Sequence, residues 1–302
     1  MVNQWMFCTT RSFSMHKLTL PLSVVCHDAG ATNLILAWLE SWGGSVKAYM
    51  EGPAVKLWQN AFPGVPLSGS LEEVLDGAIS LVTGTGWASQ LEHDARQLAH
   101  KRGIYCVAVL DHWVNYPQRF ERNGLMHWPD ELWVADEYAL RIAQDTLPSI
   151  PVRQFDNLYL KDQLARVQSS EENGTLLYVL EPVRQTWGKG EEGEFQALDF
   201  ALNHVNQLLP SGIKQIVLRL HPSESPEKYQ AYLARDPRIC MDASVDMAEA
   251  LSRANLVVGV ESSALTLALA AGRSVYSSLP PWAPALRLPH VGIQQIRHLS
   301  SL

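Results

Sequence analysis

The residues best suited to chemistry lie at the ends of two apolar runs in the second half of the chain. One run ends in Arg219–Pro222, and the other ends about forty residues later in Glu261–Ser263. Buried parallel strands carry the residues that follow them into a ligand crevice at the carboxyl edge of the sheet. Guanidinium, imidazole and hydroxyl groups in such a crevice are donors for phosphate oxygens. The two strand ends together predict a site for a phosphorylated ligand.

His221 and the two serines owe their predicted role to where these strands end. The imidazole is held at the rim of the crevice, because Pro222 cannot continue the strand. It pairs with a phosphate when protonated or donates one N–H when neutral, unless it merely caps a loop. Ser262 and Ser263 open a predicted helix, Ser263–Ala271, whose unpaired N–H groups attract anions. Alternatively, one serine is only the helix N-cap, and the two roles are compatible.

A third polar loop follows the predicted strand Leu176–Leu180. Its residues are mostly charged or hydroxyl-bearing, namely Glu181, Pro182, Arg184, Thr186 and Lys189. Such a loop supplies charge and hydroxyl groups to a nucleotide, although flexible polar loops commonly have the same composition.

In the first half of the chain, His27–Asn33 joins a predicted strand, Leu22–Cys26, to an apolar helix, Asn33–Ser41. Small residues in this loop let a substrate approach the backbone closely. Asp28 is suited to be the general base for a sugar hydroxyl, because a carboxylate within hydrogen-bond reach takes the proton as the hydroxyl attacks. Its alternative roles are an Asx turn or a helix N-cap. The glycine of the loop, Gly30, does not make a dinucleotide-binding fingerprint.

Further polar and aromatic residues follow two other predicted strands, Ala78–Val82 and Ile104–Leu110. These residues are Thr85 after the first strand and Asp111, His112, Asn115, Tyr116 and Arg119 after the second. Side chains of these types stack on sugars and hydrogen-bond to them, so we predict a sugar-binding role. Alternatively, Trp113 and Tyr116 pack beneath an interdomain loop.

Glu92 and His93 open the predicted helix Leu91–Lys101. An acidic side chain is favoured at a helix N-terminus for electrostatic reasons alone. We therefore interpret this pair as structural, and we interpret Trp128-Pro129 in the same way.

Strand and helix signals alternate along most of the chain. Besides the elements above, we predict strands at Val46–Met50, Leu132–Ala135, Gln215–Leu220, Ile239–Met241, Leu256–Val260 and Ser274–Tyr276. We predict further helices at Ala54–Ala61, from Leu71, and at Glu137–Asp145, Glu194–Leu209, Pro226–Ala234 and Val245–Ser252. The polar segment Gln163–Thr175 is the best candidate for a linker. This pattern predicts an α/β protein with two tandem Rossmann-like, doubly wound parallel sheets, residues 1–165 and 166–302, facing a central cleft.

The strand ends at Arg219–Pro222 and Gly259–Gly272 resemble the second domain of GT-B glycosyltransferases. The pattern is most similar to bacterial sialyltransferases and related nonulosonic-acid or Kdo transferases, which carry acidic-Gly, His-Pro and Ser-Ser or Ser-Thr motifs. CDP-glycerol glycerophosphotransferases carry a similar His-Pro and Ser-Ser pair, and both groups use cytidine nucleotides. The acidic-Gly motif of this chain has one acidic residue, Asp28, where the family usually has two.

The resemblance implies roles for individual residues. Asp28 with Gly30 would form the base motif, while His221, Ser262 and Ser263 would bind the phosphate of the leaving nucleotide. We expect Asp28 and His221 to be catalytic, and we expect donor binding by Glu181, Pro182, Arg219, His221, Pro222, Glu261, Ser262 and Ser263. We expect acceptor or sugar binding by His27, Gly30, Asn33, Thr85, Asp111, His112, Asn115, Tyr116 and Arg119.

The predicted function is an inverting glycosyltransferase of polysaccharide biosynthesis. It would move a sugar, such as a nonulosonic acid, from a CMP- or other nucleotide-activated donor to a glycan or lipid-linked acceptor. The scheme needs no cofactor or metal, and the chain has no Asp-x-Asp triplet. The alternatives are a sugar-nucleotide epimerase or hydrolase, a CDP-glycerol-type polyol-phosphate transferase, and a noncatalytic glycan-binding or assembly subunit.

Composition limits the partners and location. A formal net charge of −7 in 302 residues argues against a general nucleic-acid binder. No apolar run reaches the roughly 20 residues of a membrane-spanning helix, and Met1–Lys17 lacks the apolar core of a secretory signal. We expect a cytoplasmic protein with peripheral membrane contact as an option. Its four scattered cysteines, Cys8, Cys26, Cys106 and Cys240, predict reduced thiols and no structural zinc.

Overall fold

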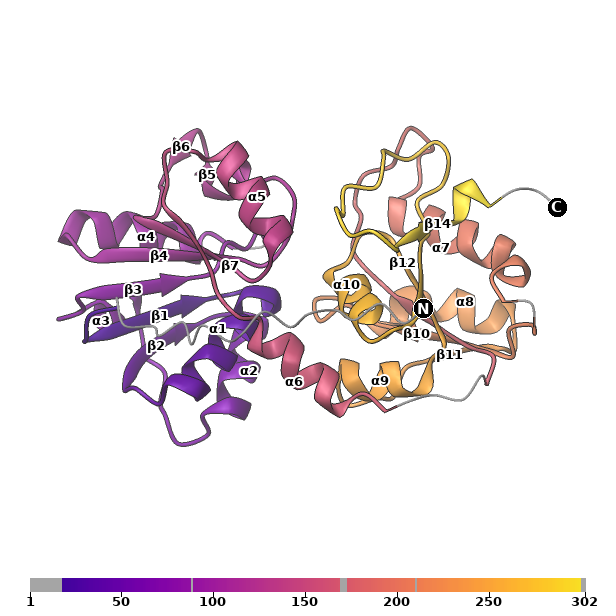
Figure 1. Cartoon of the computed structure of the whole chain (residues 1–302), viewed down its shortest axis with the longest axis horizontal. Helices are drawn as coiled ribbons and strands as arrows, with labels where there is room; N and C mark the ends of the chain where they lie inside the picture. The colour runs from indigo at the N-terminus through magenta and orange to yellow at the C-terminus, as the bar shows by residue number, and fades with distance from the viewer. Residues whose placement is uncertain (1–17, 88, 169–172, 210, 300–302) are drawn as a thin grey trace, which may run out of the picture.

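The computed structural model of the protein contains two α/β domains that lie side by side (Figure 1). The structure describes residues 18–87, 89–168, 173–209 and 211–299. Each domain contains a six-stranded sheet whose neighbouring strands are all parallel. The prediction of two tandem Rossmann-like sheets is confirmed.

The two sheets have the same kind of strand order. The first sheet consists, in spatial order, of β2 (Val46–Met50), β1 (Leu22–Cys26), β3 (Ser80–Thr83), β4 (Tyr105–Leu110), β7 (Glu131–Val134) and β8 (Val152–Gln154). The second consists of β11 (Ile239–Met241), β10 (Gln215–Arg219), β9 (Thr175–Val179), β12 (Leu256–Gly259), β13 (Ser274–Ser277) and β14 (Gln294–Gln295). A separate antiparallel hairpin pairs β5 (Glu121–Arg122) with β6 (Leu125–Met126).

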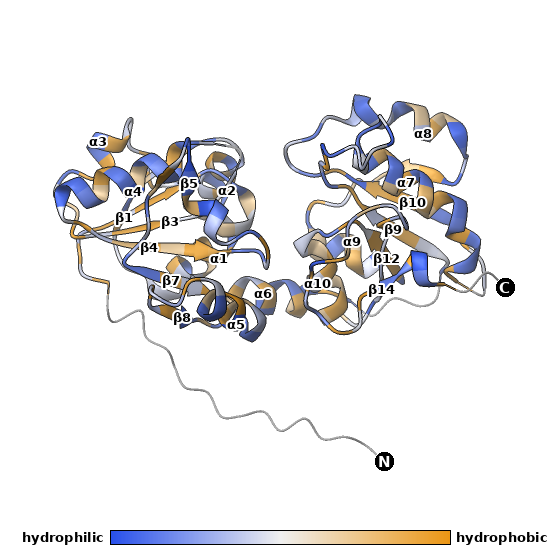
Figure 2. Ribbon diagram, turned by 90° about the horizontal axis from the view of Figure 1, so that it is seen from above, coloured by the Kyte–Doolittle hydropathy of each residue, from blue (hydrophilic) through white to orange (hydrophobic). Residues whose placement is uncertain are grey.

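Helices cover both faces of each sheet, which explains why the strands are apolar on both sides. The helices of the first domain are α1 (Ala29–Trp42), α2 (Pro53–Ala61), α3 (Leu71–Val74), α4 (Leu91–Arg102), α5 (Glu137–Thr146) and α6 (Leu158–Arg166). Those of the second are α7 (Gly193–His204), α8 (Gln230–Arg235), α9 (Met247–Arg253) and α10 (Ser263–Ala270). In β4, every residue from Cys106 to Leu110 is buried, as expected for a strand between two helical layers. Figure 2 shows the apolar strands inside and the polar helix faces outside.

Side-chain caps and glycines fix several helix ends. Asp136 and Asp246 are the N-caps of α5 and α9, and each accepts a hydrogen bond from a backbone N–H of the first turn. Such caps satisfy helix N–H groups that have no partner within the helix. Gly43 and Gly103 end α1 and α4 in the left-handed conformation, which glycine adopts without steric cost.

The chain reverses its direction of winding once in each sheet. In the first sheet β1 lies between β2 and β3, and in the second β9 lies between β10 and β12. The connections that leave the carboxyl ends of β1 and β3, and of β9 and β12, therefore run to opposite sides and leave a crevice between them. These two crevices are the places where ligands are expected.

The predicted linker is partly helical. Residues Gln163–Arg166 continue α6, which packs against α1 of the first domain and against α9 and α10 of the second. The helix begins at Asn157, whose side chain accepts the Leu160 N–H, and Arg166 forms an ion pair with Asp246. Sequence alone did not indicate this helix, because its apolar residues are only partly buried and it is held by contacts with both domains. The predicted domain boundary at residues 165 and 166 falls in its last turn.

Several predicted element boundaries were also wrong. The loop predicted between Cys26 and the helix start at Asn33 is shorter, because α1 already begins at Ala29. The helix predicted at Glu194–Leu209 ends at His204 and continues as a short 3-10 turn. The strands β8 and β14 and the hairpin were not predicted, since each has only two or three residues and lacks a periodic pattern.

Other findings concern the cysteines, the membrane and the N-terminus. Cys26 and Cys106 are buried free thiols in strands, and burial raises the pKa of both.

Within the described residues, no helix is long and apolar enough to cross a membrane. The predictions for Met1–Lys17, including Cys8, lie outside the described residues.

Candidate functional site

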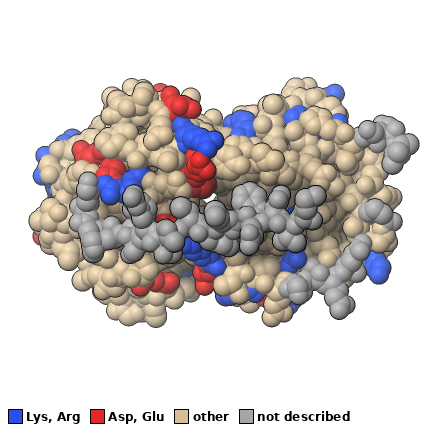
Figure 3. Space-filling model, viewed as in Figure 1, with Lys and Arg blue, Asp and Glu red and all other residues tan. Residues whose placement is uncertain are grey.

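A cavity of about 970 Å³ lies between the two domains. Predicted site residues from both halves line it, namely Gly30, Asn33, Asp111, His112, Arg219, His221, Pro222, Ser262 and Ser263. On the face seen in Figure 3, Lys and Arg stand in small groups mixed with Asp and Glu, and no large basic field appears. Among the described residues that line the cavity, the lysines and arginines are Lys56, Arg166 and Arg219, so the cavity is a crevice with specific polar groups and not a broadly cationic surface.

The second domain contributes a helix start and a histidine to this cavity. Ser262 is the N-cap of α10, and its hydroxyl accepts the Ala264 N–H at 3.2 Å. The predicted N-cap role is therefore present. Ser263 is the first residue of the helix and is exposed to the cavity. The first N–H groups of α10 and two serine hydroxyls thus lie at one wall.

His221 is half-buried at the end of β10 and held by Ser223. The Ser223 N–H donates to Nδ1 over 3.2 Å, and the Ser223 hydroxyl lies 2.7 Å from the same nitrogen. Burial lowers the pKa of His221, against the opposing influence of the Glu224 and Asp28 charges. The ring is therefore neutral near pH 7 with its proton on Nε2, which has no hydrogen-bond partner among the described residues and is able to donate to a ligand.

Two other predicted donor-binding groups, Arg219 and Glu261, already have protein partners. Arg219 lines the cavity but forms an ion pair with Asp242. The Glu261 carboxylate is bound by the Arg287 guanidinium and by the Arg287 N–H.

Glu181 links the two loops of the second crevice. Its carboxylate accepts the Glu261 N–H at 3.0 Å, and desolvation raises its pKa to about 7. Glu181, Pro182 and Glu261 do not line the cavity. In this structure Glu181 and Glu261 hold the loop that carries the serines.

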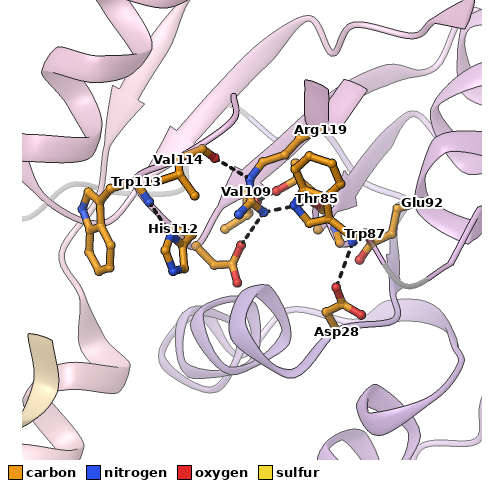
Figure 4. Close-up of polar contacts among 12 residues, drawn as sticks. Asp28, Thr85, Trp87, Glu92, Val109, His112, Trp113, Val114 and Arg119 are labelled. Atoms are coloured by element: carbon orange, nitrogen blue, oxygen red, sulfur yellow. Dashed lines mark hydrogen bonds and ion pairs between the residues drawn. The ribbon is translucent and has the colours of Figure 1, made fainter. Parts of the chain in front are cut away.

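In the first domain, Asp28 stands at the N-terminus of α1 between two loops. It occupies the N-cap position, but its carboxylate makes no cap hydrogen bond. Instead, Oδ2 accepts the Trp87 N–H at 3.1 Å (Figure 4). Oδ1 lies 2.6 Å from His27 Nδ1. The Asp28 side chain is 30% exposed. An oriented and partly solvated carboxylate of this kind is able to accept a proton.

Glu92, which the sequence analysis took for a simple helix-start residue, lies beside Asp28 and is buried. Its carboxylate accepts the His27 N–H at 3.1 Å and the Gly86 N–H at 2.5 Å. Burial, together with the negative charge of Asp28, raises the pKa of Glu92 to about 7. It therefore ties the loop after β1 to the loop after β3. The sequence offers no periodic signal for this role, because the contact depends on how α4 meets the two strand ends.

Close packing around these carboxylates explains the glycines of the two loops. A Cβ at Gly86 would lie 2.2 Å from Asp28 Oδ2, and one at Gly84 would lie 2.3 Å from Glu92 Oε1. A Cβ at Gly30 would lie 1.9 Å from Asp111 Oδ2. These positions leave no room for a side chain without moving a carboxylate.

Arg119 holds the end of β4 to the loop after β3. Its guanidinium donates to the carbonyl oxygens of Val114 and Thr85 and contacts Asp111 at 3.4 Å. The Thr85 hydroxyl donates to the Val109 carbonyl oxygen at 3.1 Å. Thr85 and Arg119 are buried and do not line the cavity. They support Asp111, which does.

His112 joins the two domains. The Trp113 N–H donates to Nδ1 at 3.0 Å, so Nε2 carries the proton and donates to the Glu261 carbonyl oxygen at 3.2 Å. Burial and the Arg119 charge lower the pKa of His112 to about 4. The neutral ring thus connects the first crevice to the residue that precedes Ser262.

Tyr116 and Asn115 do not reach the cavity. Tyr116 is 1% exposed and packs with Phe120 in an apolar core cluster of the first domain. Asn115 is exposed outside the cavity with a φ of 57°. Within the described part of the chain, no group of three or more His, Cys, Asp or Glu residues is placed to hold a metal ion.

Two Rossmann-like domains with a cavity between them define the GT-B class of fold. The chain is similar to S. aureus MnaA in a co-structure with UDP, with 10% identity, a TM-score of 0.61, and coverage of 85% of this chain and 78% of that one. It is also similar to a Listeria monocytogenes protein assigned as a UDP-N-acetylglucosamine 2-epimerase, with 13% identity, a TM-score of 0.54, and coverage of 84% and 78%. The wall teichoic acid polymerase TagF aligns with a TM-score of 0.46, 10% identity, and coverage of 86% and 71%.

At these identities the first two likenesses show a shared fold. The sequence matches no protein-family model and no curated protein.

Proposed function

We propose that the protein is a metal-independent, inverting glycosyltransferase. The observation that carries the proposal is the interdomain cavity, which His221 and the start of α10 line on one domain and Ala29 and Gly30 line on the other. Asp28 and His27 do not line the cavity themselves, and Asp28 directly precedes these two lining residues. Asp28 is near enough to His221 for its charge to act on the pKa of the imidazole. A base and a phosphate-binding wall on opposite domains suit a single displacement in which the acceptor approaches from one side and the nucleotide leaves on the other.

In this mechanism the first domain activates the acceptor. The Asp28 carboxylate takes the proton of an acceptor hydroxyl as that oxygen attacks the anomeric carbon. Hydrogen bonds from Trp87 and His27 hold the carboxylate in place, and Glu92 holds the backbone of the same two loops. The new glycosidic bond forms as the bond to the donor phosphate breaks.

The second domain stabilises the leaving nucleotide. Negative charge develops on the phosphate, and it is met by the N–H groups of α10, the hydroxyls of Ser262 and Ser263, and the Nε2–H of His221. Preorganised donors of this type lower the barrier because they need little reorganisation during the reaction. No metal is required in this scheme.

The proposal also assigns a ligand to each domain, a type of donor and a location. The first domain, residues 1–165, binds a glycan or lipid-linked acceptor, and the second, residues 166–302, binds a nucleotide-activated sugar. The Arg-Leu-His-Pro and Ser-Ser strand ends support a cytidine-activated donor, with a nonulosonic acid as the sugar and polysaccharide biosynthesis as the setting. The reaction takes place in the cytoplasm, with peripheral contact to the membrane where the acceptor is lipid-linked.

A panel of CMP-, CDP- and UDP-sugars tests the proposal. Nucleotide release is measured with and without a panel of glycan acceptors, and the anomeric configuration of the product is read by NMR. We expect release that depends on the acceptor and a product of inverted configuration. Binding without turnover would favour a noncatalytic subunit, and transfer of a polyol phosphate would favour the CDP-glycerol type of reaction.

The second candidate function is a sugar-nucleotide epimerase or hydrolase. The carboxylates Asp28, Glu92 and Asp111 all converge on the glycine-containing loops of the first crevice. Several carboxylates near an anomeric carbon suit proton transfers that need no acceptor. Nucleotide release or sugar isomerisation in the absence of any acceptor would support this function over transfer.

A further inference from the structure

One wall of the cavity is formed by matching faces of α1 and α2. From α1 the lining residues include Gly30, Asn33 and Leu34, and from α2 they are Pro53, Lys56, Leu57 and Asn60. Positions separated by three, four and seven residues lie on one face of a helix. The two helices pack against each other, so these residues form a continuous surface next to Asp28, the N-cap of α1.

This wall carries a positive charge, that of Lys56, which no residue in the described part of the chain neutralises. The other lysine and arginine side chains of the cavity are paired, Arg166 with Asp162 and Asp246 and Arg219 with Asp242. Lys56 forms no ion pair or hydrogen bond with any residue that the structure describes. The amides of Asn33 and Asn60, on the same wall, likewise have no hydrogen-bond partner among the described residues.

Chemistry of this kind fits an anion attached to a sugar. An ammonium group and two amides offer several hydrogen-bond donors, and bonds from a charged donor to an anion are stronger than neutral ones. Leu34 and Leu57 supply an apolar surface between them, which suits the C–H face of a sugar ring. Asp111 lines the same cavity in the first crevice, and its carboxylate is paired with Arg119.

We propose that Lys56, with Asn33 and Asn60, binds a carboxylate or phosphate group of the acceptor, so that the acceptor is an acidic or phosphorylated sugar. The inference rests on the proposed function, in which Asp28 is the base. A group bound one to two helical turns from the base belongs to the molecule that bears the attacking hydroxyl. The donor phosphate is bound on the opposite domain, at Ser262 and Ser263.

Matched pairs of sugars test this subsite on the full chain. The probes are methyl β-glucuronide against methyl β-glucoside, for a carboxylate, and glucose 6-phosphate against glucose, for a phosphate. Binding of each is measured by NMR titration in the presence of a saturating nucleotide, which occupies the second-domain phosphate site. We expect at least one anionic probe to bind about five- to tenfold more tightly than its neutral partner, with the preference falling at high salt.

Substitution of the lysine separates this subsite from other anion binding. In Lys56→Met the preference for the anion should fall about fivefold, while Lys56→Arg should keep it. Lys101→Met, at an exposed lysine on α4 outside the cavity, serves as the matched control and should change nothing. Lys56 is exposed, so Lys56→Met is expected to fold normally, and its melting temperature verifies this.

Equal binding of the anionic and neutral probes by the wild type, or no binding of either, would overturn the inference. A preference that persists in Lys56→Met would place the anion elsewhere and would overturn it as well. Nucleotide affinity is measured in the same samples. If the nucleotide binds and no anion preference exists, only this inference fails, whereas loss of all nucleotide binding contradicts the proposed function itself.

Discussion

The two crevices of this protein have the same topology but different chemistry. In each, a carboxyl group ties together the two loops at the point where the strand order reverses. Glu92 accepts N–H groups from the loops after β1 and β3, and Glu181 accepts one from the loop after β12. The groups around these two carboxyls differ. The first crevice contains further carboxylates, while the second contains serine hydroxyls, a helix start and a neutral imidazole. A common fold therefore fixes where a ligand binds, and the loop side chains decide whether the crevice accepts protons or binds anions.

The largest effect is expected from removing the base in the first crevice. Asp28→Asn keeps the shape of the side chain and one acceptor oxygen, but it cannot take a proton. Transfer should fall by about 10² to 10⁴ in kcat, while nucleotide affinity stays within about twofold, since the second crevice is intact. Steady-state kinetics and nucleotide titration measure the two quantities.

Asp145→Asn, at an exposed residue of α5, is the control for Asp28→Asn and should have normal activity. If Asp28→Asn transfers the sugar at the wild-type rate, Asp28 is not the base, and the proposed contrast between a proton-accepting first crevice and an anion-binding second crevice fails.

The second-largest effects concern the serines of the other crevice. Ser263→Ala removes a hydroxyl that faces the cavity, and the nucleotide Kd should rise about tenfold with little change in stability. Ser262→Ala should weaken nucleotide binding similarly and should also lower the free energy of unfolding by about 1 kcal/mol, because the helix cap is lost. Calorimetry and thermal denaturation distinguish the two variants. If neither variant changes nucleotide affinity, the serines serve α10 alone.

Glu92→Gln tests the carboxyl that organises the first crevice. The pKa of Glu92 is raised to about 7 from an ordinary value of 4.5. Its contribution to stability is thus fully present below pH 4.5 and is lost as the pH rises through 7. The free energy of unfolding of the wild type should therefore fall relative to Glu92→Gln over this range. Denaturant titrations at several pH values measure the difference.

Activity gives a second readout for Glu92. Glu92→Gln should lower kcat about tenfold. The carboxyl of Glu92 accepts one N–H group with each of its two oxygens, whereas an amide has only one oxygen. The loops that hold Asp28 should therefore loosen. Glu181→Gln is the matched variant in the second crevice and should raise the nucleotide KM more than it lowers kcat. The same kinetic change in both variants would argue that the two carboxyls only stabilise the fold.

The smallest effect is expected at Tyr116. Its hydroxyl is buried and has no hydrogen-bond partner among the residues that the structure describes. Tyr116→Phe should leave the free energy of unfolding within about 0.5 kcal/mol of the wild type or raise it slightly, with unchanged kinetics. A loss of acceptor affinity would instead show that Tyr116 reaches the sugar, as the sequence analysis expected.

The sequence predicted the fold better than it predicted the site. Long apolar strands such as β4 and capped helices such as α5 carry strong local signals, and they were found within a few residues of their predicted ends. The predicted site residues at the ends of long strands, including His221, Ser262 and Asp111, also reached the cavity. Position after a strand was a sound guide, because parallel strands end at a common edge.

The missed features depend on contacts between distant segments. Nothing in the local sequence distinguishes Glu92 from an ordinary first-turn acid, and its role follows from two backbone N–H groups at residues 27 and 86. The end of helix α6, Gln163–Arg166, was taken for part of a linker, because the helix is only partly buried and is held by contacts with both domains. Glu261 has the residue type of a ligand-binding group but is bound by Arg287.

By itself, the amino-acid sequence determined the alternation of strands and helices, the two sheets, and the strand ends where ligands are expected, since these follow from local periodicity and strand length. Only the tertiary structure decided which of the polar side chains at those ends face the cavity, which are held by partners, and where a charge such as that of Lys56 has none. The physical reason is that hydrogen bonds, ion pairs and desolvation are pairwise and spatial, so they are fixed only when the segments have come together.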